Sequence, residues 1–350
     1  MPESIKILII TSLILLSCSK SPLEQDGELL PDSPQYEAST TPVGFALGGD
    51  WKPVVKTKAD PEPELEEVGN SPAKNAFVAG DVFGVFAYYI PNGESISTPN
   101  FMYNQGVMAS DNTPSTPEDF SADIWSYTPE KYWPNTLGDK VSFYAYYPYL
   151  ARSLTLPTTD ASGAPVVTYD VTASHIDLLY AKAENKTKPA VAETVRFDFQ
   201  HMLGQLRFKI SVQNEAAGNQ TIWVKSISYE DIPQAKFNFA SETWTDKAAP
   251  RTYTAQRTDH GIEITEGTSY IYNYFTAFLV PTIIDEFTIG MSVNGQTIET
   301  ITAAASPAIE IQKGKVTTVH LTITTQNINI TSTTQDWITK NFEPVFTPDN

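Results

Sequence analysis

The sequence is nearly free of cysteine: Cys18 is the only one in 350 residues. Without a second thiol the chain can form no disulfide within itself, so any core must be held together by packing. Long hydrophobic runs are scarce as well, because after residue 20 no apolar stretch approaches the ~20 residues that a transmembrane helix needs. These absences exclude a disulfide-stapled scaffold, and we expect no membrane-spanning helix after the start of the chain.

Basic residues are few: 23 lysines and arginines stand against 41 acidic residues, for a net charge of −18. Nucleic-acid binding depends on basic side chains that replace the counterions of phosphates, and the sequence has no basic stripe. Attachment to an anionic lipid surface by charge alone is disfavoured for the same reason. We therefore expect no nucleic-acid partner.

Residue patterns that carry catalysis are also missing. There is no GxSxG turn and no glycine-rich phosphate loop. The four histidines are scattered without the spacing of a metal site: His175, His201, His260 and His320. We expect no enzymatic activity, no metal and no cofactor, and a structural role for His201. A pair of carboxylates acting on a glycosidic bond is the one enzymatic alternative, because such residues can be far apart in the sequence.

The composition that is present is typical of strands and turns, with 17 tyrosines, 17 phenylalanines and 25 prolines. Phe83, Val85, Ala87 and Tyr89 alternate at period two, and residues 141–147 repeat the pattern. Further strands are expected at 43–47, 166–171, 177–182, 195–200, 205–213, 221–230, 261–265, 270–280, 286–293, 296–302, 308–312 and 315–325. Because no long window has helical periodicity, the sequence predicts an all-β protein built from β-sandwiches.

A short apolar segment, residues 7–16, precedes the single cysteine. It has the length of the hydrophobic region of a secretory signal peptide, with Ser17 just before the expected cut. Leu15-Leu16-Ser17-Cys18 resembles a bacterial lipobox, in which the thiol takes a lipid because its thiolate is the better nucleophile. We expect a lipoprotein signal peptide at 1–17 and lipidation of Cys18. The alternative is a core cysteine that follows an ordinary signal peptide.

Two polar stretches suggest how the rest of the chain is divided. Residues 18–42 are polar, contain prolines and have no periodicity, so we expect a disordered tether. The sequence "ENKTKPAVAE" at 184–193 is the strongest candidate for a domain boundary. The expected domains are an N-terminal sandwich at 43–193 and a C-terminal sandwich at 194–350.

One loop is rich in aromatic side chains: Trp125, Tyr127, Tyr132 and Trp133. Flat rings in a loop could stack on the face of a sugar. They could equally cover one end of the N-terminal sandwich, each burying a large area with its polar tip at the surface. We favour the second interpretation.

Several stretches in a fixed order resemble the fimbrillin-like family of bacterial fimbrial subunits. Besides the lipobox they are "VVKTKA" at 54–59, "GDVFGVFAYY" at 80–89, "MYNQGV" at 102–107, "WSYTPEKYWPN" at 125–135, "DLLYA" at 177–181, "FDFQHMLGQLRFKI" at 197–210 and "DW" at 336–337. The resemblance implies two transthyretin-like β-sandwiches in tandem and export as an outer-membrane lipoprotein at the cell surface. It also implies a fimbrium in which a protease removes the first strand and a C-terminal strand of the next subunit replaces it.

Carried over to this chain, the resemblance implies a removable first strand at about 43–56. Its core-facing side chains would be Phe45, Leu47 and Val54, and the cut would fall at Lys56 or Lys58. The family's protease is often specific for arginine, yet the first arginine here is Arg152. Either a protease that tolerates lysine acts, or this member keeps its first strand as an anchor, a cap or a non-polymerising surface lipoprotein.

The candidate donor strand is the tail, with Ile328, Ile330, Trp337 and Ile338 as its side chains. The expected partners are other fimbrial subunits, the membrane through the lipid anchor, and a host or bacterial surface receptor. The function implied is a structural subunit of a fimbrium that contributes to adhesion or biofilm formation. The alternative is a lipid-anchored protein that binds a carbohydrate or a protein and never polymerises.

Overall fold

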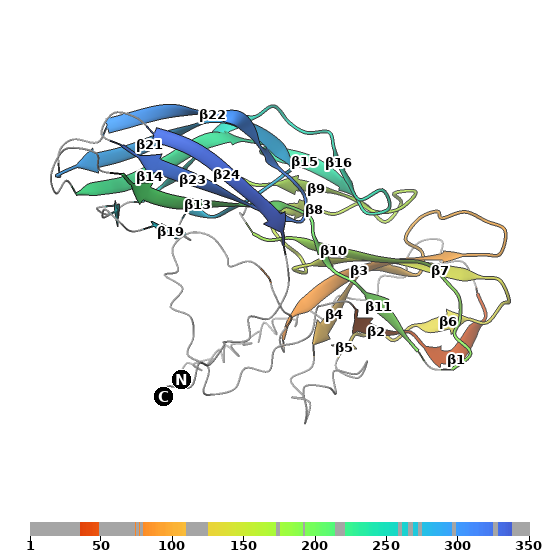
Figure 1. The fold of residues 1–350 in the computed structure, drawn as a ribbon. Coiled ribbons are helices and arrows are strands. Elements are labelled where there is room, and N and C mark those ends of the chain that lie inside the picture. The colour runs from red at the N-terminus through yellow and green to blue at the C-terminus, as the bar shows by residue number, and fades with distance from the viewer. Residues whose placement is uncertain are drawn as a thin grey trace, which may run out of the picture.

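The computed structural model describes residues 36–48, 74, 77, 80–109, 125–172, 176–191, 193–213, 221–257, 261–264, 269–271, 275–295, 299–324 and 328–337. These residues form 24 β-strands and no α-helix, so the prediction of an all-β fold is confirmed. In Figure 1 the strands of the N-terminal part lie to the right and those of the C-terminal part to the upper left.

The N-terminal part is organised around a six-stranded antiparallel sheet in the order β12-β10-β7-β3-β4-β5. Its strands are β3 (Val82–Ile90), β4 (Met102–Ala109), β5 (Trp125–Ser126), β7 (Lys140–Tyr147), β10 (Leu179–Lys186) and β12 (Gln200–His201). The central strands β3 and β7 are buried on both faces. This explains why both sequences are almost entirely apolar instead of alternating between apolar and polar residues.

The two faces of this sheet pack into different cores. On β3, Phe83, Val85 and Ala87 belong to the N-terminal core. The alternating residues Phe86 and Tyr88 point to the opposite face and belong to a second cluster. Two short strand pairs cover the N-terminal core. They are β1 (Ala38–Pro42) with β6 (Tyr132–Pro134), antiparallel, and β2 (Gly44–Leu47) with β11 (Thr194–Phe197), parallel.

A four-stranded sheet lies on the other face and takes strands from both halves of the sequence. Its order is β16-β15-β9-β8, with β8 (Leu154–Thr155), β9 (Val166–Asp170), β15 (Gln234–Asn238) and β16 (Thr243–Thr245). The second cluster, which we call the junction core, includes Tyr144 and Tyr180 of the six-stranded sheet, Phe237 of β15 and Val316 of the C-terminal part. The junction core therefore joins the two parts of the chain.

The C-terminal part is a sandwich of two five-stranded sheets around a third core. One sheet contains β13 (Gly204–Val212), β19 (Ser269–Ile271), β20 (Ala277–Leu279), β23 (Lys315–Ile323) and β24 (Ile328–Asp336). The other contains β14 (Ile222–Asp231), β17 (Arg251–Gln256), β18 (Ile262–Ile264), β21 (Thr282–Val293) and β22 (Glu299–Ile311). Strand β24 pairs antiparallel with β23 and is the outermost strand of its sheet.

Packing crosses the division expected at residue 193. Strand β11, expected in the C-terminal domain, pairs with β2, and its Phe197 is fully buried in the N-terminal core. Strand β9 of the first half pairs along its whole length with β15 of the second. The chain leaves the N-terminal core only after Phe199.

Candidate functional site

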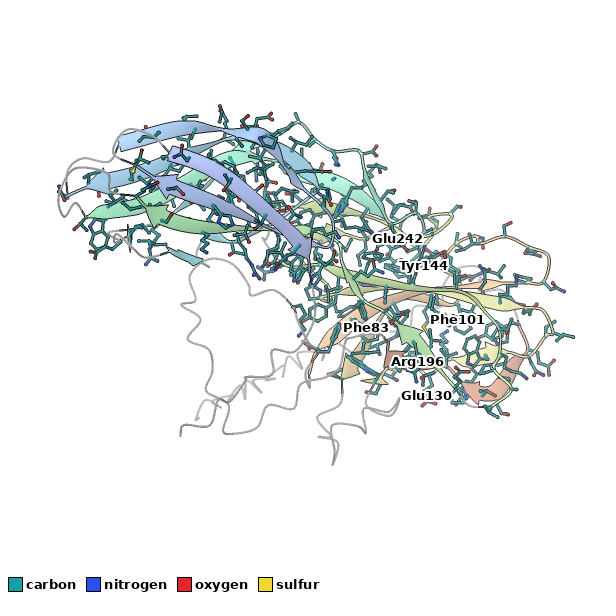
Figure 2. The ribbon with its side chains drawn as sticks, in the orientation of Figure 1. Phe83, Phe101, Glu130, Tyr144, Arg196 and Glu242 are labelled. Carbon is teal, nitrogen blue, oxygen red and sulfur yellow. The ribbon has the colours of Figure 1, made fainter. Side chains whose placement is uncertain are left out.

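The first ordered segment of the chain completes the N-terminal core through Phe45. This side chain has an exposed fraction of 0%. Its ring stacks on Phe197 with 5.5 Å between centroids and meets Phe83 and Phe143 edge-on at 6.3 and 5.8 Å. Leu47 is half-buried against the same core. Figure 2 shows Phe83 among the side chains of this core. Of the three side chains expected to fill the core, Phe45 lies in it and Leu47 packs against it.

The backbone around Phe45 is held from both sides. The Val43 amide donates to the Lys131 carbonyl at 2.8 Å, and the Gly48 amide donates to the Phe197 carbonyl at 2.9 Å. The Tyr127 hydroxyl donates to the Val43 carbonyl at 2.7 Å, and its ring lies 5.4 Å from that of Phe45. The segment is thus a short insert whose main anchor in the core is one aromatic ring.

The aromatic residues of the loop at 125–133 pack mainly inward. Trp125 and Trp133 are buried in the N-terminal core, and Tyr127 packs against it. Tyr132 is the exposed member, 37% accessible, and its hydroxyl donates to Glu130 at 3.1 Å. Of these four rings, only that of Tyr132 is exposed enough to stack on a sugar.

At the other end of the chain, β24 is held in its own sheet. Nine residue pairs join it to β23, from Ile328 opposite Ile323 to Asp336 opposite Lys315. Ile328 is buried in the C-terminal core and Ile330 packs against that core. From Thr331 to Asp336 every side chain of the strand is exposed. The candidate donor strand is therefore an edge strand whose side chains reach the core only at its first residues, Ile328 and Ile330.

The residue after β24 returns to the protein interior. Trp337 is buried in the junction core and stacks on His201, with 3.6 Å between ring centroids and 6° between planes. His201, on β12, places Nδ1 2.9 Å from Oδ1 of Asp177, and both side chains are buried. His201, for which a structural role was expected, thus forms a buried pair with Asp177 and stacks against Trp337.

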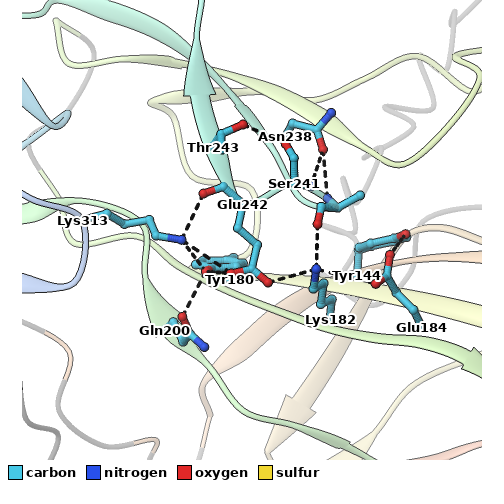
Figure 3. Close-up of polar contacts among 11 residues, drawn as sticks. Tyr144, Tyr180, Lys182, Glu184, Gln200, Asn238, Ser241, Glu242, Thr243 and Lys313 are labelled. Carbon is cyan, nitrogen blue, oxygen red and sulfur yellow. Dashed lines mark hydrogen bonds and ion pairs between the residues drawn. The ribbon is translucent and has the colours of Figure 1, made fainter.

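A polar network lies beside the junction core and links three separate turns and strands (Figure 3). The Tyr180 hydroxyl donates to Glu242 at 2.8 Å, and Lys313 donates to the Tyr180 hydroxyl at 2.7 Å. Lys182 forms an ion pair with Glu242 at 3.0 Å and donates to the Ala240 carbonyl at 2.6 Å. The network joins β10 to the turn before β16 and to the turn between β22 and β23.

The charges of this network are mutually adjusted. Burial alone would raise the pKa of Glu242, but hydrogen bonds from Lys182 and Tyr180 outweigh it and lower that pKa. Burial lowers the pKa of Lys313, although Glu242 opposes the shift. Glu242 also adopts a φ of 59°, in the region that favours glycine. A carboxylate kept at such a position indicates that its contacts support the turn, and the network cross-links the three elements.

Other predicted sites have no structural description. Cys18, Val54, Lys56, Lys58 and Ile338 lie outside the described residues. Within the described residues, no group of three or more histidine, cysteine, aspartate or glutamate side chains could hold a metal ion. The same residues contain no helix long and apolar enough to cross a membrane.

The sequence matches the family model described as "Fimbrillin-like" over residues 71–337. The chain belongs to the fimbrillin-like family. Membership supports a fimbrial or adhesin-like protein of the cell surface with a structural, non-enzymatic role. No curated protein matches the chain.

Solved structures resemble the fold of this fimbrillin-like chain. A fimbrial protein from Bacteroides vulgatus is 19% identical with a TM-score of 0.54, covering 85% of this chain and 99% of that one. A proposed cell adhesion protein from Bacteroides uniformis is 18% identical with a TM-score of 0.47, covering 85% and 98%. One from Bacteroides ovatus is 17% identical with a TM-score of 0.47, covering 88% and 100%.

Sequence reasoning missed the partner of His201 and the polar network of this fimbrillin-like protein. His201 and Trp337 both stood in stretches that carry the family resemblance, but their stacking joins positions 136 residues apart in the chain (337 minus 201). Asp177 was part of the stretch "DLLYA". No periodicity connects these three residues, so only the tertiary fold brings them together.

Proposed function

We propose that the chain is a structural subunit of a cell-surface fimbrium that assembles by strand addition and contributes to adhesion or biofilm formation. The observation that carries the proposal is the placement of Phe45. A four-residue strand paired along one side with β11 inserts one fully buried ring into the N-terminal core. Loss of that strand would leave a vacant site lined by Phe83, Phe143 and Phe197, which an incoming strand could fill.

The tail is the proposed donor. Its candidate side chains are Ile328, Ile330, Trp337 and Ile338, and β24 is the outermost strand of its sheet among the described residues. To act as a donor it must leave β23, because in the monomer Ile328 and Ile330 pack against their own core. A tail that leaves one subunit and enters the next makes a head-to-tail contact that does not close, and such contacts build filaments.

Maturation would require two covalent steps. Lipidation of Cys18 would hold the precursor at the outer membrane, and a cut at Lys56 or Lys58 would free the segment that carries Phe45. The lack of any arginine before Arg152 favours a second candidate, an anchor or cap subunit that keeps its first strand. Receptor binding remains a separate proposal, for which Tyr132 is the exposed ring of the aromatic loop.

Size-exclusion chromatography of four forms tests the assembly proposal. Untrimmed chain should stay monomeric, and chain trimmed after Lys58 should form oligomers. Trimmed Ile338→Asp should assemble much less, because a carboxylate cannot fill an apolar site. Trimmed Thr339→Asp, changed at the neighbouring position, is the matched control and should assemble like the parent. If the trimmed parent remains a monomer at high concentration, the polymer proposal fails and the anchored binding protein takes its place.

A further inference from the structure

A continuous series of contacts runs from the tail to the segment that follows the proposed cleavage loop. Trp337 stacks on His201 at 3.6 Å and lies parallel to Phe278, with 5.7 Å between those ring centroids. His201 Nδ1 is 2.9 Å from Asp177 Oδ1. The other oxygen of Asp177 accepts a hydrogen bond from the backbone amide of Lys74 at 2.8 Å. One carboxylate therefore contacts both the ring under the tail and residue 74.

Lys74 is in turn fixed to the N-terminal core. Its ammonium group forms an ion pair with Asp81 at 2.6 Å and lies 4.8 Å from the ring centroid of Tyr147. Phe77, three residues on, packs on Tyr147 and Phe199 with 5.1 Å between centroids in both cases. The position of residues 74 and 77 thus depends on aromatic packing at this edge of the core.

The same packing reaches the side chain of the first strand. Phe77 lies 6.5 Å from Phe83, and Phe83 lies 6.3 Å from Phe45, both edge-on. Phe197, which stacks on Phe45, is also 6.0 Å from Phe199. Loss of Phe45 would therefore remove support from Phe83, which contacts Phe77 directly, and from Phe197, which reaches Phe77 through Phe199.

Trp337 is well placed to control the tail. All six side chains from Thr331 to Asp336 are exposed, so the second half of β24 is held by backbone pairing with β23. Two polar side-chain contacts add to it, Thr334 with Thr317 at 3.2 Å and Thr333 with His320 at 3.3 Å. The ion pair between Lys315 and Asp336 is exposed and adds little. Burial and stacking of Trp337 form the one large apolar anchor described at this end of the strand.

We propose that Trp337 is a latch that retains β24 in its own sheet, and that Asp177 makes the latch sensitive to whether Phe45 occupies the N-terminal core. The precursor would then withhold its tail until the first strand has left. The biological purpose rests on the proposed assembly function. The coupling itself is a property of the monomer and needs a test of its own, because a series of contacts alone does not demonstrate coupling.

Hydrogen–deuterium exchange of the full chain, read by mass spectrometry, tests the latch. In Trp337→Ala, peptides covering 331–337 should exchange at least tenfold faster, while peptides of β14 are unchanged. Trp337→Phe keeps a stacking ring and should change exchange less than threefold. An unchanged 331–337 segment in Trp337→Ala overturns the latch, and so does an equal rise in β14, because that indicates global unfolding.

Two further substitutions test the link to the first strand. Phe45→Ala should speed exchange of 331–337 at least threefold, whereas Phe101→Ala, a buried ring of the same core that lies farther from Lys74 in the contact series, should not. Asp177→Asn keeps an oxygen for His201 but loses the acceptor for Lys74, so it should also raise exchange. In the double variant of Phe45 and Asp177, the exchange rate of 331–337 should exceed that of either single variant by no more than about twofold. Both substitutions interrupt the same series of contacts, so their effects should not add.

Additive effects, or no effect of Phe45→Ala, would overturn the coupling. If Phe45→Ala fails to fold, Phe45→Leu gives the same comparison with a smaller cavity. All of these measurements are made on monomer at low concentration. A subunit can therefore show the latch and still fail to polymerise, or polymerise without it, which keeps failure of this proposal distinct from failure of the assembly proposal.

Discussion

Asp231, at the end of β14, is a buried carboxyl group whose replacement should stabilise the protein at neutral pH. Its exposed fraction is 1%, and neither carboxylate oxygen has a hydrogen-bond partner among the described residues. Burial raises its pKa to about 7, although the nearby Ile232 amide and the charge of Arg251 act in the opposite direction. The group therefore holds its proton more tightly in the folded chain than in the unfolded chain.

The sign and size of the effect follow from this difference. A carboxyl group with a raised pKa favours folding when it is protonated, so its contribution is present at low pH. That contribution is lost as pH rises from about 4, the unfolded pKa, to about 7. Three pKa units correspond to about 4 kcal/mol in the free energy of unfolding. Asp231→Asn removes the ionisation and should restore most of it.

Urea unfolding at pH 4.5 and pH 8 measures the effect. The variant and the parent should be similar at pH 4.5, and at pH 8 the midpoint of the variant should be higher by about 1 M or more. Asp170→Asn is the control of opposite sign. Hydrogen bonds from the Thr172 hydroxyl and amide lower the pKa of Asp170, so its contribution is present at neutral pH and lost as pH falls. If Asp231→Asn is no more stable than the parent at pH 8, Asp231 is not an unpaired buried charge.

Three other substitutions probe the core and the leader. Phe45→Ala should lower the free energy of unfolding by about 3–5 kcal/mol in denaturant titrations, whereas Leu137→Ala, at a side chain that is 95% exposed, should change it by less than about 0.5; equal effects would contradict the burial of Phe45. Gly84→Ala should lower it by about 1–3 kcal/mol, because a Cβ at that position would collide with the Tyr146 ring, and an unchanged melting temperature would refute the contact. Cys18→Ala should abolish incorporation of labelled fatty acid and retention in the outer membrane; normal labelling would rule out lipidation at this residue.

Strands with a strong apolar pattern were predictable from the sequence. Residues 82–90 and 140–147 alternate between two buried faces, so successive residues point to two different cores and every second residue points to the same one. The expected strands at 205–213 and 221–230 match β13 and β14 within one residue. Periodicity sufficed there because local pattern and tertiary burial agree.

Strands at exposed edges were missed or divided. No strand was expected at β17, "RTYTAQ", because four of its six residues are exposed and polar alternation gives little signal. Strand β22 was expected as two strands at 296–302 and 308–312, with Pro307 near the gap. It is one strand, and Pro307 is accommodated because β22 is outermost and its partner β21 shifts register between Ile284 and Glu286.

The candidate site was only partly predictable. Phe45 was identified through the family resemblance, which implied a removable first strand with this side chain facing the core. The environment of Asp177, His201 and Trp337 was not, because it depends on three segments that are far apart in the sequence and are brought together only by the tertiary fold. The division at 193 followed a polar, proline-containing stretch, but the core around Phe197 takes its members from beyond that stretch.

The lengths of the sheet edges have a consequence for aggregation between copies of the chain. The six-stranded sheet, whose central strands are buried on both faces, ends on both sides in strands of two residues, β5 and β12. Edges this short offer a foreign strand almost no template, which protects the protein against side-by-side aggregation. Among the described outer strands without proline or lysine, the longest is β24, whose second half carries threonine, serine and glutamine. Unwanted pairing along this strand would meet hydroxyl-rich surface, where little apolar area would stabilise a wrong contact.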